Sequence, residues 1–190
     1  MELSRVIAWR RSIRRFSKRP IEKEEIIEIL EAARRAPSSS NSQPWHFIVV
    51  DDTKKIGAIV RAAPFGTKSI ISFARDAQVL IVCCYKKKIT HHLAQLFGHD
   101  NHLIDVAIAT DHLVLRATDL GIGSCWIGWF DEKKVKRLLD IPRNFRIAVM
   151  VALGYPEGPS TDDGIGGIQA RPRKSLSEIS SYNSFRDPFI

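Results

Sequence analysis

Two clusters of basic residues near opposite ends of the sequence are the first candidates for chemistry. The chain reads Arg10-Arg11-Ser12-Ile13-Arg14-Arg15 near its amino end and Arg171-Pro172-Arg173-Lys174 near its carboxyl end. Arginine presents planar groups of N–H donors that match phosphate oxygens, and Ser12 adds a hydroxyl donor on the same short segment. The pattern favours one anion held from both ends of the fold, with a phosphate monoester as the first candidate.

Two further segments carry polar or glycine-rich motifs. Residues 37–44 read Pro-Ser-Ser-Ser-Asn-Ser-Gln-Pro, a loop rich in hydroxyl and amide groups and bounded by prolines. Residues 121–128 read Gly-Ile-Gly-Ser-Cys-Trp-Ile-Gly. This second motif lacks the G-x-G-x-x-G spacing followed by a helix, so a dinucleotide-binding turn is not favoured.

Cysteine and histidine do not indicate a metal centre. Cys83, Cys84 and Cys125 show no C-x-x-C spacing, so we expect buried free thiols. Four histidines cluster without a neighbouring cysteine and with only two nearby acids, so we predict no metal site; they are His91, His92, His99 and His102.

Composition fits one globular domain spanning 1–190, since the chain is 44% hydrophobic and 26% charged. The net charge of +8 suits nucleic acid, acidic membranes and anionic cofactors alike. Residues 3–21 hold seven basic and no acidic side chains. The uncharged runs fall short of the roughly 18 residues that a membrane span needs, and no signal peptide is visible, so we expect a cytoplasmic protein without membrane contact.

Hydrophobic periodicity predicts alternating helices and strands without strict βαβ regularity. The predicted helices cover a short segment around residues 6–9, then 22–35, 53–63, 103–120 and 131–139, and the strands cover 45–50, 77–85, 124–129 and 146–153. In the long helix, the predicted apolar stripe joins Leu103, Val106, Ala107, Thr110, Leu113, Val114, Ala117 and Leu120. The fold class is α+β, a sandwich of helices around one mixed sheet.

The four motifs, in their order along the chain, resemble the nitroreductase family of FMN-dependent oxidoreductases. They are Arg-Arg-Ser-Ile-Arg at 10–14, the loop from Pro37 continued through Pro-Trp-His-Phe, Gly-Ile-Gly-Ser-Cys-Trp-Ile-Gly at 121–128 and Arg-Pro-Arg at 171–173. The resemblance covers nearly the whole chain. It implies an FMN-binding fold that works as an intertwined homodimer, with two flavin sites at the subunit interface.

The resemblance also assigns site residues. It implies that the FMN phosphate and ribityl chain are held by Arg10, Arg11 and Ser12, joined by Arg171 and Arg173. Arg14 is similar to the basic residue near the flavin N1/O2 edge. The residues that reach the same flavin from the other subunit are Pro37, Ser38, Ser39 and Asn41. In the segment Trp126-Ile127-Gly128, the backbone N–H of Gly128 is the implied donor to flavin N5.

The implied activity is hydride transfer from NAD(P)H through flavin N5 to nitroaromatics, quinones or similar electron-poor acceptors. Three alternatives stay open: a specialised dehalogenating or flavin-fragmenting enzyme of the same fold, a basic nucleic-acid-binding protein, and a flavin-binding protein without turnover. Where larger members read the flavin pyrimidine edge with polar side chains, this chain has Ile70, Ile71 and Phe73, with Lys68 or Ser69 as substitutes. Trp129 and Phe130 either wall the pocket or pack in the core.

Overall fold

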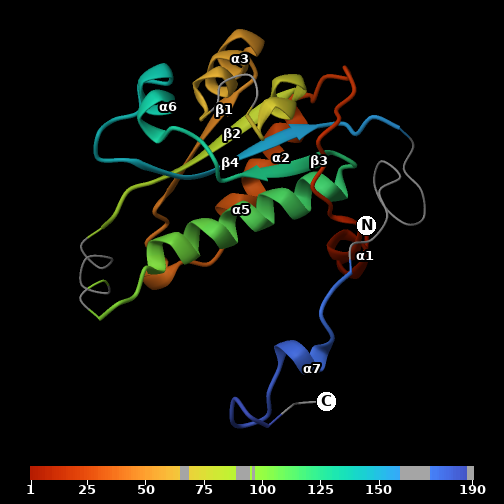
Figure 1. Cartoon of the computed structure of the whole chain (residues 1–190), viewed down its shortest axis with the longest axis vertical. Helices are drawn as coiled ribbons and strands as arrows, with labels where there is room; N and C mark the ends of the chain where they lie inside the picture. The colour runs from red at the N-terminus through yellow and green to blue at the C-terminus, as the bar shows by residue number, and fades with distance from the viewer. Residues whose placement is uncertain (65–68, 89–94, 96, 159–171, 188–190) are drawn as a thin grey trace.

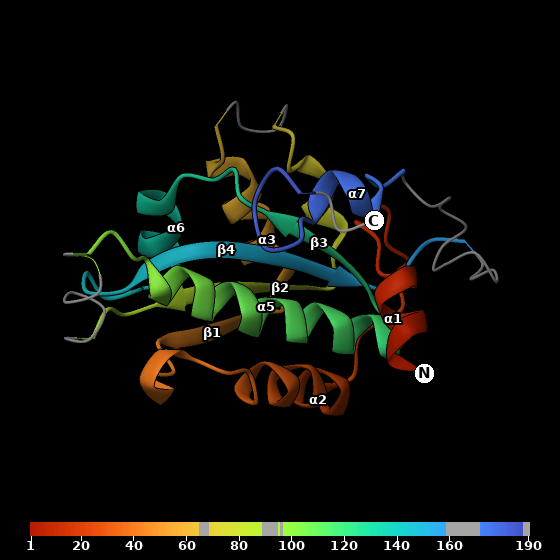
Figure 2. The same ribbon diagram turned by 90° about the horizontal axis from the view of Figure 1, so that it is seen from below.

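A four-stranded sheet with helices on both faces forms the centre of the protein (Figures 1 and 2). The computed structural model describes residues 1–64, 69–88, 95, 97–158 and 172–187. The strands lie in the order β1-β2-β4-β3. Their bounds are β1 Trp45–Val50, β2 Val79–Tyr85, β4 Arg146–Gly154 and β3 Gly123–Ile127. The predicted α+β class is confirmed.

The helices form one layer above the sheet and two below it in Figure 2. On one side lie α3 (Thr53–Ala62), α6 (Glu132–Leu138) and the 3-10 helix η3 (Ser72–Asp76). On the other side α5 (Asn101–Asp119) packs on the sheet, and α2 (Lys23–Arg34) packs on α5. Each face of the sheet has its own buried apolar cluster, and α2 and α5 share one of them.

All seven residues of β2 are buried, because helices cover the strand from both faces. Neighbouring side chains of a strand point to opposite faces, so Cys83 packs in the cluster of α5 and Cys84 in the cluster of α3. Burial raises the pKa of Cys83 to about 12 and that of Cys84 to about 11. The predicted doubly covered strand and buried free thiols are confirmed.

Helix boundaries follow from capping groups that are visible in the sequence. Asp52 accepts from the backbone N–H of Lys54 at 2.7 Å, and Asp131 accepts from that of Lys134 at 3.0 Å. Glu22 and Glu25 form a capping box at the start of α2. Gly121 follows α5 with φ +76°, a left-handed conformation that favours glycine.

Strand direction corrects the sequence prediction of a mixed sheet. All pairs among the four strands are antiparallel, and the parallel element in the described residues is an isolated bridge between Ser12 and Ser124. Val50 at the end of β1 lies opposite Leu80 near the start of β2. The connection through α3 therefore leaves β1 and enters β2 at the same end of the two strands, which makes them antiparallel.

The buried face of α5 also differs from the predicted stripe. Leu103 and Ala107 are exposed, whereas His102 and Asp105 are buried. The first turns of α5 are covered by the polar loop of residues 37–44, whose groups bond to α5. Two of the buried side chains at this end of the helix are therefore polar, whereas the apolar Leu103, Ile104 and Ala107 are exposed.

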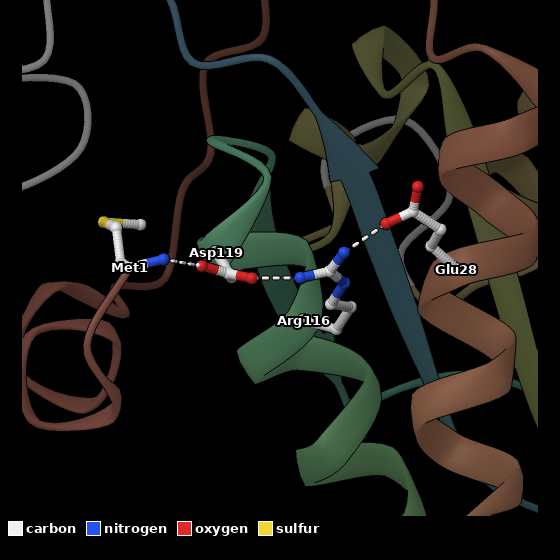
Figure 3. A network of polar contacts seen from close by, with 4 residues as sticks. All are labelled: Met1, Glu28, Arg116 and Asp119. Carbon is white, nitrogen blue, oxygen red and sulfur yellow. Dashed lines mark hydrogen bonds and ion pairs between the residues drawn. The ribbon is translucent and has the colours of Figure 1, made fainter.

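Polar contacts attach α1 (Leu3–Trp9) to the carboxyl end of α5 (Figure 3). The amine of Met1 contacts Asp119, Asp119 contacts Arg116, and Arg116 also pairs with Glu28 of α2. The hydrogen bond from the amine lowers the pKa of Asp119 against the effect of burial. The network fixes where the arginine segment after α1 begins.

Residues 172–187 project away from the rest of the chain (Figure 1). This carboxyl-terminal arm contains α7 (Leu176–Ile179) and exposes large apolar side chains at a three-residue spacing, namely Leu176, Ile179, Tyr182 and Phe185. Among the described helices, none has both the length and the apolar character that a bilayer crossing demands.

Candidate functional site

Residues 10–17 lie against the ends of β3 and β4. The backbone N–H of Ile13 donates to Ser124 at 2.9 Å, and that of Ser17 donates to Tyr155 at 2.8 Å. A Cβ at Gly123 would lie 2.7 Å from the Ile13 side chain, and one at Gly154 would lie 2.7 Å from Phe16. Glycine at these two positions therefore allows the arginine segment to approach the strands closely.

This approach brings the first and third motifs together. Ser12 is bridged to Ser124, two residues before Trp126. Arg10 and Ser12 are half-buried, while Arg14 is exposed with its guanidinium carbon 5.7 Å from the centre of the Phe73 ring. Arg11 is half-buried and donates to the carbonyl of Ala8 at 2.7 Å. The predicted phosphate-binding residues thus form one segment beside β3.

Buried and exposed side chains alternate at the end of β3. Ile127 is 3% exposed and packs in the core, so any contact of this residue with a ligand falls to its backbone. Trp126 is partly exposed at the sheet edge, and Trp129 is 56% exposed. Phe130 packs against the core. The sequence analysis gave two alternatives for Trp129 and Phe130, a pocket wall or packing in the core. Phe130 packs against the core, and Trp129 faces outward.

Gly128 differs from every other glycine that the structure describes. The others have a positive φ or meet a neighbouring group near the position of a Cβ. Gly128 has neither, since its φ lies outside the left-handed range and nothing lies within 4 Å of an added Cβ. The fold of this chain alone does not require glycine here, whereas a group lying flat against the backbone would. This open backbone fits a planar ligand.

The polar loop of residues 37–44 is held by the buried carboxylate of Asp105 on α5. Asp105 accepts from the backbone N–H of Ser39 at 3.0 Å and from the hydroxyl of Ser42 at 3.2 Å. Within the loop, Ser40, Asn41 and Gln43 have φ of 51°, 50° and 44°. Left-handed backbone at such residues costs about 1 kcal/mol each, so the surrounding contacts must hold it.

Three loop side chains use their acceptors inside the protein. Ser38 Oγ accepts from the Gln43 N–H at 3.0 Å, and Asn41 Oδ1 accepts from Gln43 Nε2 at 2.9 Å. Ser39 Oγ accepts from Asn101 Nδ2 at 3.4 Å. A hydroxyl or amide that accepts in this way keeps its own hydrogens for donation. The loop therefore suits a ligand edge that is rich in acceptors.

Within one chain the structure does not bring this loop to the arginine segment. The loop bonds to the first turns of α5, whereas α1 is attached at Asp119, and Figure 2 shows the two at opposite ends of that helix. The fourteen residues from Asp105 to Asp119 span about 20 Å at the rise of an α-helix. The two halves of the predicted site are thus separated by most of the length of α5.

The structure describes one of the two arginines of the carboxyl-terminal basic cluster. Arg173 is exposed in the arm, where it donates to the carbonyl of Pro172 at 3.4 Å. Arg171 lies outside the described residues. Convergence of the two clusters stays a prediction.

The segment expected to read the flavin pyrimidine edge is largely apolar. Ile70 is 77% exposed, Ile71 is buried, and Ser69 Oγ accepts from the N–H of Ile71 at 3.4 Å. Lys68 lies outside the described residues, as do His91 and His92. His102 is buried with its ring centre 5.0 Å from that of Tyr85. No group of metal-ligating side chains occurs in the part of the chain that the structure describes.

The sequence analysis missed Asp105, Asn101 and Gln43 as parts of the site. Asp105 carried a signal, because it lies next to Val106 on the face of the helix that should be buried. A charged side chain on such a face is rare unless it has partners. In the sequence, the polar loop of residues 37–44 was the segment whose hydroxyl and amide groups could donate hydrogen bonds to this carboxylate.

Comparisons with known proteins find similar sequences and similar folds. The sequence model described as the nitroreductase family matches residues 7–65 and 61–155. The chain is 38% identical over 160 residues to an Archaeoglobus fulgidus protein assigned as an NADH dehydrogenase/NAD(P)H nitroreductase, covering 82% of this chain and 86% of that one. It is 29% identical over 172 residues to the 5,6-dimethylbenzimidazole synthase of Rhodospirillum rubrum, covering 81% and 82%. The solved structure of an FMN-dependent nitroreductase from Clostridium difficile R20291 superposes with a TM-score of 0.76 at 26% identity, covering 95% and 98%.

Proposed function

Because this chain belongs to the nitroreductase family, we propose that it is an FMN-dependent oxidoreductase that uses NAD(P)H to reduce nitroaromatics, quinones or similar electron-poor compounds. FMN, when bound, supplies the transfer of hydride between a nicotinamide and an acceptor. The single observation that carries the proposal is Gly128, whose backbone is left open directly after β3, the strand whose Ser124 is bridged to Ser12.

The arginine segment fits the phosphate of FMN. A phosphate monoester carries nearly two negative charges at neutral pH, and charge-assisted hydrogen bonds from guanidinium groups are among the strongest in proteins. Arg10, Arg11 and Ser12 would hold this group, with Arg171 and Arg173 joining them. The close approach of residues 10–17 to the strands fixes the backbone of this segment.

Arg14 and Gly128 would act on the ring. The guanidinium of Arg14 would stabilise the negative charge that the reduced flavin gains at its N1/O2 edge. The Phe73 ring, 5.7 Å away, restricts where that guanidinium lies. The backbone N–H of Gly128, reached through Trp126 and Ile127, would donate to N5, and the absence of a side chain would let the ring approach.

The distance between the two half-sites supports an intertwined homodimer. Pro37, Ser38, Ser39 and Asn41 lie too far from the arginine segment of their own chain to share one flavin with it, so they would serve the flavin of a second copy. Leu103 and Ile104 on α5 and the apolar side chains of the carboxyl-terminal arm are exposed on the single chain. Burying such side chains between copies stabilises a dimer by about 2 kcal/mol for each fully buried one.

The visible spectrum of the purified protein tests this function. We expect a yellow protein that binds FMN, is bleached by anaerobic NAD(P)H and is recoloured by a quinone. A colourless protein that does not take up added FMN would overturn the proposal. Binding of RNA or DNA with a steep salt dependence and without flavin would instead favour the nucleic-acid alternative.

A substrate panel separates the nitroreductase activity from specialised chemistry on the same fold. Rapid reduction of nitroaromatics and quinones is the expected result. Bound flavin with poor nitro reduction would favour a dehalogenating or flavin-fragmenting enzyme, and bound flavin with no turnover of any acceptor would favour a non-catalytic flavoprotein. The cytoplasmic location stays a prediction.

A further inference from the structure

The buried carboxylate of Asp105 lies outside the motifs that carry the proposed function. Asp105 is 4% exposed and belongs to α5, in the turns that the polar loop covers. Burying a charge costs free energy unless hydrogen bonds compensate, so a buried acid at this place indicates a structural or functional role. Its partners Ser39 and Ser42 are 66 and 63 residues away in the sequence, and both belong to the polar loop.

We propose that Asp105 is a positioning residue for the cofactor: it holds the polar loop so that Ser38, Ser39 and Asn41 present hydrogen-bond donors to the FMN of a second copy. This inference rests on the proposed function and deepens it. Asp105 itself would not contact the flavin, because its carboxylate oxygens accept hydrogen bonds from Ser39 and Ser42 of the loop.

The hydrogen-bond pattern supports this role step by step. Asp105 fixes the backbone of Ser39 and the side chain of Ser42, which flank the left-handed residues Ser40 and Asn41. Gln43, in the same loop, donates from its backbone N–H to Ser38 Oγ and from its side-chain amide to Asn41 Oδ1. With their acceptors used in this way, the hydroxyls and the amide can turn their hydrogens outward.

Removing the carboxylate should therefore weaken FMN binding without removing any predicted flavin contact. In Asp105→Ala the Ser39 N–H and the Ser42 hydroxyl lose their acceptor, and the loop is free to leave its left-handed conformation. We expect the dissociation constant for FMN to rise about tenfold or more, the range for losing hydrogen bonds to a charged group. The measurement is a titration of the apo-dimer with FMN.

Two variants control this measurement. Asp105→Asn keeps an oxygen that accepts from Ser39, and its amide can donate to Ser42 Oγ, so we expect affinity within about threefold of wild type. Asp111→Ala removes an exposed acid from the same helix and should leave the affinity unchanged. If Asp105→Ala does not fold, Ser42→Ala removes one of the two bonds and should still raise the dissociation constant.

The midpoint potential of the bound flavin separates positioning from mere stability. Donors to flavin oxygens stabilise the electron-rich reduced form, so Asp105→Ala saturated with FMN should have a more negative midpoint potential than wild type, and Asp105→Asn should restore it. If wild type binds no FMN, the proposed function falls and this inference with it. If wild type binds FMN and Asp105→Ala matches it in affinity and potential, only the role of Asp105 is overturned.

Discussion

At the residue scale, the described glycines separate into those that the fold needs and one, Gly128, that it does not need. Gly123 and Gly154 have no room for a methyl group because Ile13 and Phe16 lie against them. Gly128 has room, and its backbone conformation is open to other residues. The sequence alone cannot make this distinction, because it depends on which residues meet across the fold.

Replacing Gly128 by alanine should spare the fold and damage the site. We expect the free energy of unfolding of Gly128→Ala to lie within about 0.5 kcal/mol of the wild-type value, because the added methyl group meets nothing in the described chain. The same methyl group would obstruct the flavin ring, so FMN affinity should fall about tenfold or more. Thermal unfolding of the apo-protein and FMN titration measure the two effects.

Gly154→Ala is the matched control for this change. Its Cβ would lie 2.7 Å from Phe16, so we expect overpacking to cost about 1–3 kcal/mol of unfolding free energy. Wild-type FMN affinity in Gly128→Ala would contradict the placement of the flavin at this backbone.

The arginines should recognise the phosphate rather than the ring. In the double variant Arg10→Ala, Arg173→Ala, we expect retention of FMN to be lost while weak affinity for riboflavin, which lacks the phosphate, changes little. Arg15→Ala is the control, because the exposed Arg15 has its Nε 3.8 Å from Oε2 of the exposed Glu157 and makes only a weak surface ion pair. Equal losses for FMN and riboflavin would refute a phosphate contact.

At the scale of elements, α5 connects the two half-sites and shows where sequence reasoning succeeds. Its periodicity predicted a long helix over 103–120, and the patterns of 53–63 and 131–139 predicted α3 and α6, because these signals are local. Strand direction and the burial of Asp105 depend on contacts between distant segments. Of the site, the motifs were visible in the sequence, but the loop's attachment to α5 was not.

Acid should weaken the attachment of α6, which follows Gly128. Glu132 accepts from Arg146 Nε at 2.8 Å and from the Ile147 N–H at 3.0 Å. Burial raises the pKa of Glu132, but these hydrogen bonds outweigh it and the net pKa is lowered. A folded-state pKa below the unfolded value means that this stabilisation is present above the unfolded pKa and is lost as pH falls through the folded pKa.

Glu132→Gln should therefore reduce stability at pH 7 and have little effect below the folded pKa of Glu132. We expect a cost of about 1 kcal/mol at pH 7, because Arg146 is largely exposed to solvent. Thermal unfolding of both proteins between about pH 3 and pH 7 measures it. A difference that does not shrink toward low pH would contradict the assignment of this stabilisation to the Glu132 carboxylate.

At the scale of the whole molecule, the single chain keeps the two halves of the proposed flavin site apart. One end of α5 carries the arginine segment and the other carries the polar loop, while the carboxyl-terminal arm projects with exposed apolar side chains. Two copies related by a twofold axis would place the loop of one beside the arginines of the other, twice over.

Charged residues in the arm should dissociate such a dimer. In Ile179→Asp, Phe185→Asp we expect a monomer that binds FMN poorly, because neither side chain is buried in its own chain. Sedimentation measures the mass. A dimer with full FMN content would show that the arm does not join the copies.

The most direct test of the shared site is a heterodimer of two defective chains with different affinity tags. One chain carries Arg10→Ala and Arg11→Ala, and the other carries Ser39→Ala and Asn41→Ala. Each homodimer should bind FMN poorly, whereas the tagged heterodimer should recover one intact site, about half of the wild-type FMN per dimer. A heterodimer that binds FMN no better than either homodimer would contradict a flavin held between two copies.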